Sequence, residues 1–224
     1  MAQAASNSLA PLPGDWRQRL RRALLAAPEH RPEYCRFGGF AANSPALRSR
    51  LLEALPAALK AAAVLVPIIE RPDGPTLLLT VRASHLRRHA GQISFPGGRL
   101  EAQDSDVAAA AIRETEEEIG IGAAHIEPIG FLSDLMVQTG YRITPVVALL
   151  RPGFTLAPVS SEVAEVFELP LAAALAADSY RLGRRTLRDV EVDSWELPYG
   201  PYQIWGATAG MLANLCEVFG ARSA

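Results

Sequence analysis

Cysteine is scarce in this 224-residue chain, which holds only Cys35 and Cys216, far apart in the sequence. So few cysteines exclude a disulfide-stapled scaffold and fit a reducing compartment. We therefore expect a cytoplasmic protein in which each thiol is a small buried apolar group. No apolar run reaches the roughly 20 residues that a membrane-spanning helix needs. The N-terminus also lacks the basic segment and apolar core of a secretory signal.

Charge of either sign is not in excess. The chain has 22 Lys and Arg residues against 24 Asp and Glu residues, a net charge of -2, which argues against a dedicated nucleic-acid binder. Attraction for phosphate groups must therefore come from a local cluster of cations. Apolar residues make up 49% and charged residues 21%, as in an ordinary globular protein. We expect a flexible arm over residues 1–13 and a single domain over residues 14–224, with no membrane partner.

The periodicity of apolar residues predicts alternating groups of helices and strands. Helices are expected at residues 15–27, 45–59, from 104–106 to 120, 171–177 and 206–219. Strands are expected at residues 63–70, 76–82, 126–132 and 142–150, with further strands between 181 and 205. A turn signal, Pro72-Asp73-Gly74, predicts that the first two strands form a hairpin. This order of elements predicts an α+β fold with a mixed sheet between helices.

The third expected helix carries a cluster of glutamates. At about 100° per residue, Glu114, Glu117 and Glu118 form one acidic ridge beside the apolar face, whereas Glu116 points away from it. The apolar face is formed by Ala108, Ala111, Ile112, Thr115 and Ile119. Such a ridge is either a solvated helix surface or a site for a hard divalent cation such as Mg²⁺ or Mn²⁺.

A glycine-rich loop, Phe95-Pro96-Gly97-Gly98, precedes this helix. Its proline restricts the chain, and its two glycines permit close approach of the backbone to a ligand. A Gly-Gly pair alone is weak evidence for a site. The same pair followed by a helix with an acidic ridge and a glycine stop is far more specific.

A basic run connects the second expected strand to the glycine-rich loop. Five potential cations fall within eight residues: Arg82, His85, Arg87, Arg88 and His89. They are either scattered surface charge or contacts for phosphate, which Arg binds in a two-pronged manner. We expect Arg82, Arg87 and Arg88 to contact the substrate together with Gly98. The acidic ridge suits a hard cation better than the two histidines do.

Residues 97–121 resemble the Nudix box. The second half of that motif matches Arg113-Glu114-Thr115-Glu116-Glu117-Glu118-Ile119-Gly120-Ile121, with Thr115 at a usually apolar position. The first half is one residue longer than usual. Its acidic position therefore falls on Asp104 or on Ser105, depending on which end of the motif is aligned.

The segment upstream of the box is similar to the coenzyme A pyrophosphatase signature of Nudix proteins. The matching residues are Leu78-Leu79-Thr80-Val81-Arg82-Ala83, Arg87, Gly91 and Phe95-Pro96-Gly97-Gly98. The resemblance implies an α/β/α sandwich and a Mg²⁺- or Mn²⁺-dependent hydrolase. Its implied substrate is coenzyme A or a thioester of it, cleaved to 3′,5′-ADP and 4′-phosphopantetheine or the acylated form.

The resemblance also implies roles for individual residues. The carbonyl of Gly97 and the carboxylates of Glu114, Glu117 and Glu118 would hold metal. Either Glu114 or Glu162 would be the base that activates water, with Glu165 as the second candidate after Glu162 in that region. Two alternatives remain open: a Nudix hydrolase of another nucleoside diphosphate derivative such as ADP-ribose, and a non-catalytic nucleotide-sensing module. The intact carboxylates argue against the second.

Other polar and aromatic residues allow two interpretations each. The loop 133–141 contains Asp134, Gln138 and Tyr141 and either lines a pocket or lies on the surface. The aromatic residues near the C-terminus either stack a base or, as we prefer, pack in the core. They are Trp195, Tyr202 and Trp205.

Overall fold

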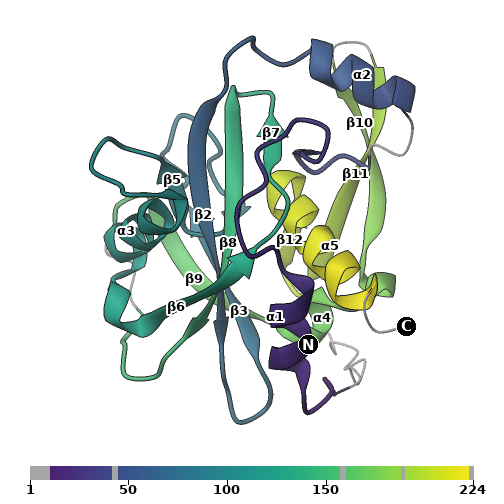
Figure 1. Ribbon diagram of the computed structural model, residues 1–224. Coiled ribbons are helices and arrows are strands. Elements are labelled where there is room, and N and C mark those ends of the chain that lie inside the picture. The colour runs from purple at the N-terminus through teal and green to yellow at the C-terminus, as the bar shows by residue number, and fades with distance from the viewer. Residues whose placement is uncertain (1–10, 42–44, 157–159, 188–189, 222–224) are drawn as a thin grey trace.

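The computed structural model describes residues 11–41, 45–156, 160–187 and 190–221 (Figure 1). Its α-helices are α1 (Trp16–Ala23), α2 (Pro45–Glu53), α3 (Val107–Ile119), α4 (Leu171–Ala174) and α5 (Gly206–Ala221). Its strands are β1 (Arg36–Phe37), β2 (Lys60–Ile69), β3 (Thr76–Arg82), β4 (Ile93–Ser94), β5 (Gly97–Arg99), β6 (Ile126–Phe131), β7 (Leu135–Val137), β8 (Tyr141–Leu150), β9 (Val163–Pro170), β10 (Arg181–Leu187), β11 (Val190–Tyr199) and β12 (Tyr202–Trp205).

A mixed sheet forms the centre of the molecule. Its main order is β1-β7-β8-β2-β3-β4, and β5, β6 and β9 pair with β2, β8 and β3 respectively. The long strands β2 and β8 run parallel over their whole length, from Lys60 opposite Tyr141 to Ile69 opposite Leu150. Figure 1 shows α3 on one side of this sheet and α1, α4 and α5 on the other. The predicted α+β fold with a mixed sheet between helices is confirmed.

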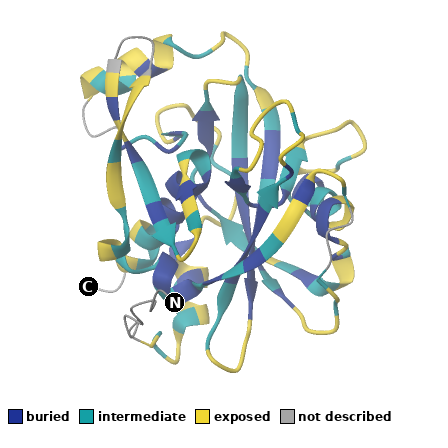
Figure 2. Ribbon diagram, turned by 180° about the vertical axis from the view of Figure 1, so that it is seen from behind, coloured by how far each residue is buried: buried dark blue, intermediate teal, exposed yellow. Residues whose placement is uncertain are grey.

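Alternation along β2 separates two hydrophobic clusters. Ala63 and Leu65 pack in the cluster that includes α3, whereas Val66 and Ile68 pack in the larger cluster that includes α5. Successive residues of a strand point to opposite faces of a sheet, so this alternation assigns a face to each neighbouring strand residue. Figure 2 shows the buried residues concentrated along these central strands.

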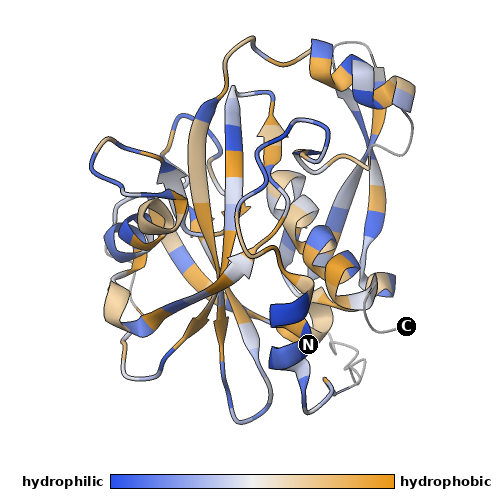
Figure 3. Ribbon diagram, in the orientation of Figure 1, coloured by the Kyte–Doolittle hydropathy of each residue, from blue (hydrophilic) through white to orange (hydrophobic). Residues whose placement is uncertain are grey.

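A second sheet lies beside the first and is held to it by α5. It is antiparallel, in the order β10-β11-β12. Leu197 and Ile204 of this sheet join Leu212 of α5 and Leu79 of the central sheet in one hydrophobic cluster. Figure 3 shows that α5 is largely hydrophobic, whereas α1 is strongly hydrophilic. The strands predicted between 181 and 205 are confirmed, but their separation into a sheet of their own was not predicted.

The hairpin predicted for residues 63–70 and 76–82 is confirmed, but its strands pair only next to the turn. The two strands exist, but β2 and β3 pair only at Ile68 with Leu77 and at Ile69 with Thr76. Beyond that point they separate, because β2 pairs with β5 and β8, and β3 pairs with β4 and β9. The resulting gap at the other end of β2 is where the glycine-rich loop enters the sheet.

Some elements differ from their expected bounds. The segment expected as a loop at 133–141 contains β7, and the strand β9 was not predicted. Of the expected N-terminal arm, residues 1–10 lie outside the described residues, whereas Leu12 packs against the main hydrophobic cluster. Within the described ranges, no helix is long and apolar enough to cross a membrane.

Candidate active site

The helix α3 begins and ends where the sequence predicts. The carboxylate of Asp106 accepts a hydrogen bond from the Ala109 backbone N–H at 2.8 Å and so caps the first turn. At the other end, Gly120 adopts a left-handed conformation with φ of 75°, which ends the helix. The buried positions include Glu118 as well as the expected Thr115 and Ile119. The helix is thus rotated so that one acidic residue faces the sheet.

The two glycines bring the β5 backbone close to both β2 and α3. Gly97 has φ of +155°, and a Cβ there would lie 2.3 Å from the Ala63 carbonyl oxygen. A Cβ on Gly98 would lie 2.3 Å from Oε1 of Glu114 and 2.6 Å from its Oε2. Only a residue without a side chain fits at each of these two positions. The Glu114 carboxylate therefore packs directly against the backbone of β5.

Glu118 is the most deeply buried carboxylate of the ridge. The residue is 8% exposed, and its Oε2 has no hydrogen-bond partner in the described part of the chain. Burial, and then the nearby Glu114 charge, raise the pKa of Glu118 to about 7, although the Arg82 charge and the Gly97 backbone oppose this shift. Burial also raises the pKa of Glu114, against a hydrogen bond from Arg113 at 3.1 Å.

The remaining glutamates of α3 lie further out. The Glu117 side chain is 60% exposed and lies 3.3 Å from an Arg113 nitrogen. Glu116 is exposed and points toward Gly122, away from Glu114. The structure therefore brings Glu114 and Glu118 together at the sheet, leaves Glu117 at the rim, and confirms that Glu116 points elsewhere.

Asp104, and not Ser105, holds the arginine of the motif. Arg113 donates to both carboxylate oxygens of Asp104, with each N–O distance 3.0 Å. Arg113 also donates to the Arg99 carbonyl at 3.0 Å. Its hydrogen bonds lower the pKa of Asp104. Asp104 thereby ties the start of the α3 segment to β5, which carries Gly97 and Gly98.

Glu162 lies near the ridge, in the segment before β9. Arg82 donates to its carboxylate at 3.0 Å, and the Ala83 N–H donates to its carbonyl at 2.8 Å. The Ser160 N–H donates to the carbonyl of Glu118 at 3.3 Å. The charges of Arg82 and Glu162 both act on the Glu118 carboxylate. The structure thus brings these three residues together from three separate segments.

Glu165 lies on the other face of the sheet. It pairs with Val81 of β3 in the antiparallel register, two residues from the pair of Phe167 with Leu79. The side chains of Phe167 and Leu79 pack in the hydrophobic cluster on the α5 side, so Glu165 also points to that side. The Tyr202 hydroxyl donates to the Glu165 carboxylate, and the Tyr202 ring stacks on Phe167 at 3.7 Å. Of the two acidic candidates in this region, only Glu162 lies beside α3.

The other cations of the basic run lie in the exposed connection between β3 and β4. Arg87 and Arg88 are exposed, and neither forms a hydrogen bond or ion pair with any residue that the structure describes. His85 is also exposed. His89 has φ of 57° and contacts Gln92 at 2.7 Å through Nδ1. Arg82 therefore lies between the acidic side chains of Glu118 and Glu162, whereas Arg87 and Arg88 remain available to a ligand.

Asp134 of the segment 133–141 belongs to a buried polar network that the sequence does not predict. The Asp134 side chain is fully buried and lies 2.7 Å from His30, 2.7 Å from the Thr144 hydroxyl, which donates to it, and 3.4 Å from Arg142. No local pattern could reveal these contacts, because His30 and Asp134 are 104 residues apart. The network ties the residue before β7 to the first turn-side residues of β8 and to His30.

The donor atoms at the ridge fit a hard divalent cation that takes its remaining ligands from water and a substrate. Within the described ranges, no three His, Cys, Asp or Glu side chains are grouped closely enough to form a complete metal cage. Mg²⁺ normally binds one or two carboxylates and takes its other ligands from water and substrate phosphates. The half-buried carboxylate of Glu114 and the buried carboxylate of Glu118, which has an unpartnered oxygen, match that requirement.

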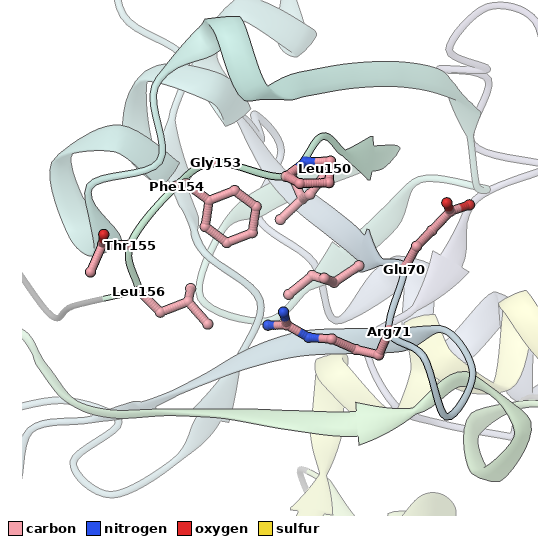
Figure 4. A pocket seen from close by; sticks show the side chains of 9 residues that line it. Glu70, Arg71, Leu150, Gly153, Phe154, Thr155 and Leu156 are labelled. Atoms are coloured by element: carbon pink, nitrogen blue, oxygen red, sulfur yellow. The ribbon is translucent and has the colours of Figure 1, made fainter.

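A cavity of about 390 Å³ lies elsewhere, at the far ends of β2 and β8 (Figure 4). Its lining includes Ile69, Leu150 and Phe154. Arg71 borders it, but its guanidinium is bound to Glu168 at 3.0 and 2.5 Å. None of the residues that the sequence singles out lines this cavity, so it is separate from the candidate site.

Comparison with known proteins agrees with this geometry. Residues 59–190 match the family model described as NUDIX domain, which is more than half of the chain. The chain is 44% identical over 161 residues to the uncharacterized Nudix hydrolase NudL of Escherichia coli O7:K1, covering 72% of this chain and 83% of that protein. NudL of Shigella boydii serotype 18 gives the same identity and coverage. The solved structure of the Nudix hydrolase RenU from M. smegmatis superposes with a TM-score of 0.51 at 20% identity, covering 73% of this chain and 88% of that one. The chain belongs to the Nudix family.

Proposed function

We propose that this protein hydrolyses the diphosphate bond of coenzyme A or its thioesters, with Mg²⁺ or Mn²⁺ as cofactor. The products would be 3′,5′-ADP and 4′-phosphopantetheine or its acylated form. The observation that carries the proposal is the unpartnered Oε2 of Glu118, buried beside Glu114. A buried carboxylate oxygen without a partner is costly, and a cation shared with substrate phosphates would satisfy it.

The Gly97 carbonyl and the carboxylates of Glu114 and Glu118 would hold the cation, and Glu117, which lies at the exposed rim, would move inward to join them. When bound, a divalent ion neutralises the negative charge of the diphosphate and the charge that develops as water attacks phosphorus. The chain's own contribution is to fix this arrangement. Arg113 and Asp104 lock β5 to α3, so that Gly97 and Glu114 approach the substrate from adjacent elements.

Glu162 is the stronger of the two candidate bases. Arg82 binds its Oε2, while its side chain is 52% exposed and its Oε1 is left to accept a proton from water. Glu114, the other candidate base, packs against Gly98 and accepts a hydrogen bond from Arg113. Glu162 can therefore reach a water molecule at the ridge while Glu114 is held as a ligand.

The substrate class rests on the basic run. Arg87 and Arg88 are exposed cations next to the glycine-rich strand and have no protein partner among the described residues, which suits them to phosphate binding. Arg82 contributes a third positive charge at the ridge. Coenzyme A offers three phosphates to such a cluster, one of them on the 3′ position of its ribose.

A substrate panel tests the proposal. We would assay coenzyme A, acetyl-coenzyme A, dephospho-coenzyme A and ADP-ribose with Mg²⁺ and with Mn²⁺, and identify products by chromatography. The expected result is metal-dependent release of 3′,5′-ADP, with coenzyme A or its thioester as the preferred substrate. Preferred cleavage of ADP-ribose would overturn the substrate assignment. Binding of these nucleotides without turnover would instead indicate a sensing module.

A further inference from the structure

Arg99 and Tyr141 form a cation–aromatic pair next to the glycine-rich strand. The Arg99 guanidinium lies 5.5 Å from the centre of the Tyr141 ring. Arg99 directly follows Gly98 in β5, and Tyr141 is the first residue of β8. Arg99 is exposed and Tyr141 is half-buried, so the pair is open to solvent one residue away from the candidate metal site.

Strand register places this pair on the opposite sheet face from the acidic ridge. Gly98 pairs with Ala63, which faces α3, and the close approach of Gly98 to Glu114 agrees with that direction. Arg99 pairs with the next residue of β2, Ala62, and therefore emerges on the α5 side. Tyr141 lies two residues before the partner of Ala62 in β8 and shares that face. The small side chain of Ala62 leaves room for the guanidinium to reach across β2.

The positive charge of this pair is not neutralised by any acidic residue that the structure describes. In the described part of the chain, the Arg99 side chain pairs with no carboxylate, and the Tyr141 hydroxyl has no hydrogen-bond partner. The comparable pair of Arg185 over Trp205 at 5.0 Å differs, because Glu196 binds that arginine at 2.7 Å. Arg99 keeps its full charge and a planar face for a ligand.

Arg113 connects this pair to the ridge. It donates to the backbone carbonyl of Arg99 at 3.0 Å and to Glu114 at 3.1 Å. The Arg99 backbone is therefore fixed by the same arginine that orients the acidic ridge. A nucleotide with its diphosphate at Gly97 and Gly98 would carry its base around the edge of β5 to the other face of the sheet.

We propose that Arg99 and Tyr141 are the platform on which the aromatic base of the nucleotide substrate stacks. The guanidinium plane and the tyrosine ring both suit a flat, electron-rich base, since Arg stacks on aromatic faces. This inference rests on the proposed function only in that the substrate is a nucleotide. It assigns the base to the α5 side, and it leaves the phosphates to the ridge and the basic run.

Binding of AMP and of ribose 5-phosphate to the metal-free protein tests the platform, because these ligands differ only by the base. Titration calorimetry should show tighter binding of AMP to the wild type. Replacing either platform residue by alanine (Tyr141→Ala or Arg99→Ala) should weaken AMP binding by about 5- to 150-fold, the range expected for one stacked base, and leave ribose 5-phosphate unchanged. Tyr141→Phe keeps the ring and should bind AMP as the wild type does.

A matched surface variant and a turnover assay complete the test. Arg151→Ala removes a 64%-exposed arginine just after the far end of β8 and should not affect AMP binding. With coenzyme A as substrate, Tyr141→Ala should raise KM by the same factor as it weakens AMP binding, with kcat within about threefold of wild type. No preference of the wild type for AMP, or an unchanged preference in both alanine variants, would overturn the platform. If AMP discrimination holds but coenzyme A is not cleaved, the proposed function fails and the platform stands.

Discussion

The guanidinium of Arg113 donates two hydrogen bonds, each of 3.0 Å, to the carboxylate of Asp104. The Asp104 side chain is only 3% exposed, so the pair is largely withdrawn from water. The same arginine also contacts Glu114 and the carbonyl of Arg99. One side chain therefore links the loop before α3, the acidic ridge and the glycine-rich strand.

Removing the Asp104 carboxylate should destabilise the fold. Asp104→Asn removes the carboxylate that accepts two hydrogen bonds from Arg113, although Arg113 keeps its contacts with Glu114 and Glu117. We therefore expect the free energy of unfolding to fall by about 1.5–3 kcal/mol. Urea unfolding followed by circular dichroism measures this change. The control is Arg151→Ala, which breaks an exposed pair with Glu127 at 3.4 Å and should change stability by less than about 1 kcal/mol. Equal effects of the two variants would contradict the anchoring role.

The acidic ridge predicts a contrast between neighbouring glutamates. Glu114→Gln and Glu118→Gln should each abolish most turnover while the protein stays folded, because each removes a charge that the cation needs. Glu116→Gln should retain activity, since that side chain is exposed and points toward Gly122. Steady-state kinetics with Mg²⁺ and with Mn²⁺ compare the three variants. Damage from Glu116→Gln as severe as that from Glu118→Gln would show the ridge assignment to be wrong.

The raised pKa of Glu118 predicts that the metal-free protein loses stability as pH rises. Below about pH 4.5 the carboxyl is protonated in both folded and unfolded states, and it contributes no pH dependence. Between 4.5 and the folded value of about 7, the unfolded state releases the proton first, so stability falls with pH. Above about pH 7 this effect is complete and amounts to about 3 kcal/mol.

Urea unfolding in EDTA from pH 4 to 8.5 measures this effect. Glu118→Gln should lack that part of the pH dependence and should be more stable than wild type at pH 8. Adding Mn²⁺ at pH 8 should stabilise the wild type and have a much smaller effect on the variant. Parallel pH profiles of the two proteins would mean that burial does not perturb Glu118.

Local sequence signals predict α3, its glutamates and the long strands well, whereas they predict the short strands and the pairing of the sheet poorly. The caps at Asp106 and Gly120 and the helical period are properties of neighbouring residues, so they can be read directly. The strands β4, β5 and β7 have only two or three residues each, which is too short to show a period. Their pairing depends on partners far along the chain. Local signals therefore predict the β2–β3 hairpin, but not the strands that separate β2 from β3 beyond its turn.

In the candidate site too, the sequence predicts what depends on neighbouring residues but not what depends on contacts between distant segments. The sequence predicts that Glu114 and Glu118 share one side of α3, but not that Glu118 faces the sheet, because helix rotation is set by packing against β2 and β5. The contact of Arg82 with Glu162 joins residues 80 positions apart. The sequence predicts that Phe95-Pro96-Gly97-Gly98 contacts a ligand, and in the structure Gly98 leaves the space that the Glu114 carboxylate occupies.

Glu162 and Glu165 are expected to differ sharply. If Glu162 is the base, Glu162→Gln should lower kcat by about 10²–10⁴-fold. Glu165→Gln should be mild, because that carboxylate lies on the other sheet face and binds Tyr202. Single-turnover rates with coenzyme A would separate a chemical defect from slow product release. Rates near wild type for Glu162→Gln would remove it from the site and leave Glu114 as the base.

The basic run predicts discrimination of the substrate's 3′-phosphate. We expect at least one of Arg82, Arg87 and Arg88 to contact that group, and a charge-assisted contact contributes roughly 1.5–3 kcal/mol. Coenzyme A should therefore exceed dephospho-coenzyme A in kcat/KM by about 10- to 150-fold. Alanine at the responsible arginine should erase this difference, and if that arginine is Arg87 or Arg88, cleavage of dephospho-coenzyme A should be unchanged.

The three positions can be separated by their surroundings. Alanine at Arg87 or Arg88 removes an exposed side chain that has no partner in the described chain, so a loss of discrimination there reports on phosphate contact alone. Alanine at Arg82 also frees Glu162, so it should lower kcat for both substrates. A preference for coenzyme A that survives all three substitutions would place the phosphate elsewhere. Arg184 and Arg185, which are exposed on β10, are then the next positions to test, together with Arg188, which lies outside the described residues. Discrimination that disappears only in the Arg82 variant, with its loss of kcat, would instead assign Arg82 to both tasks.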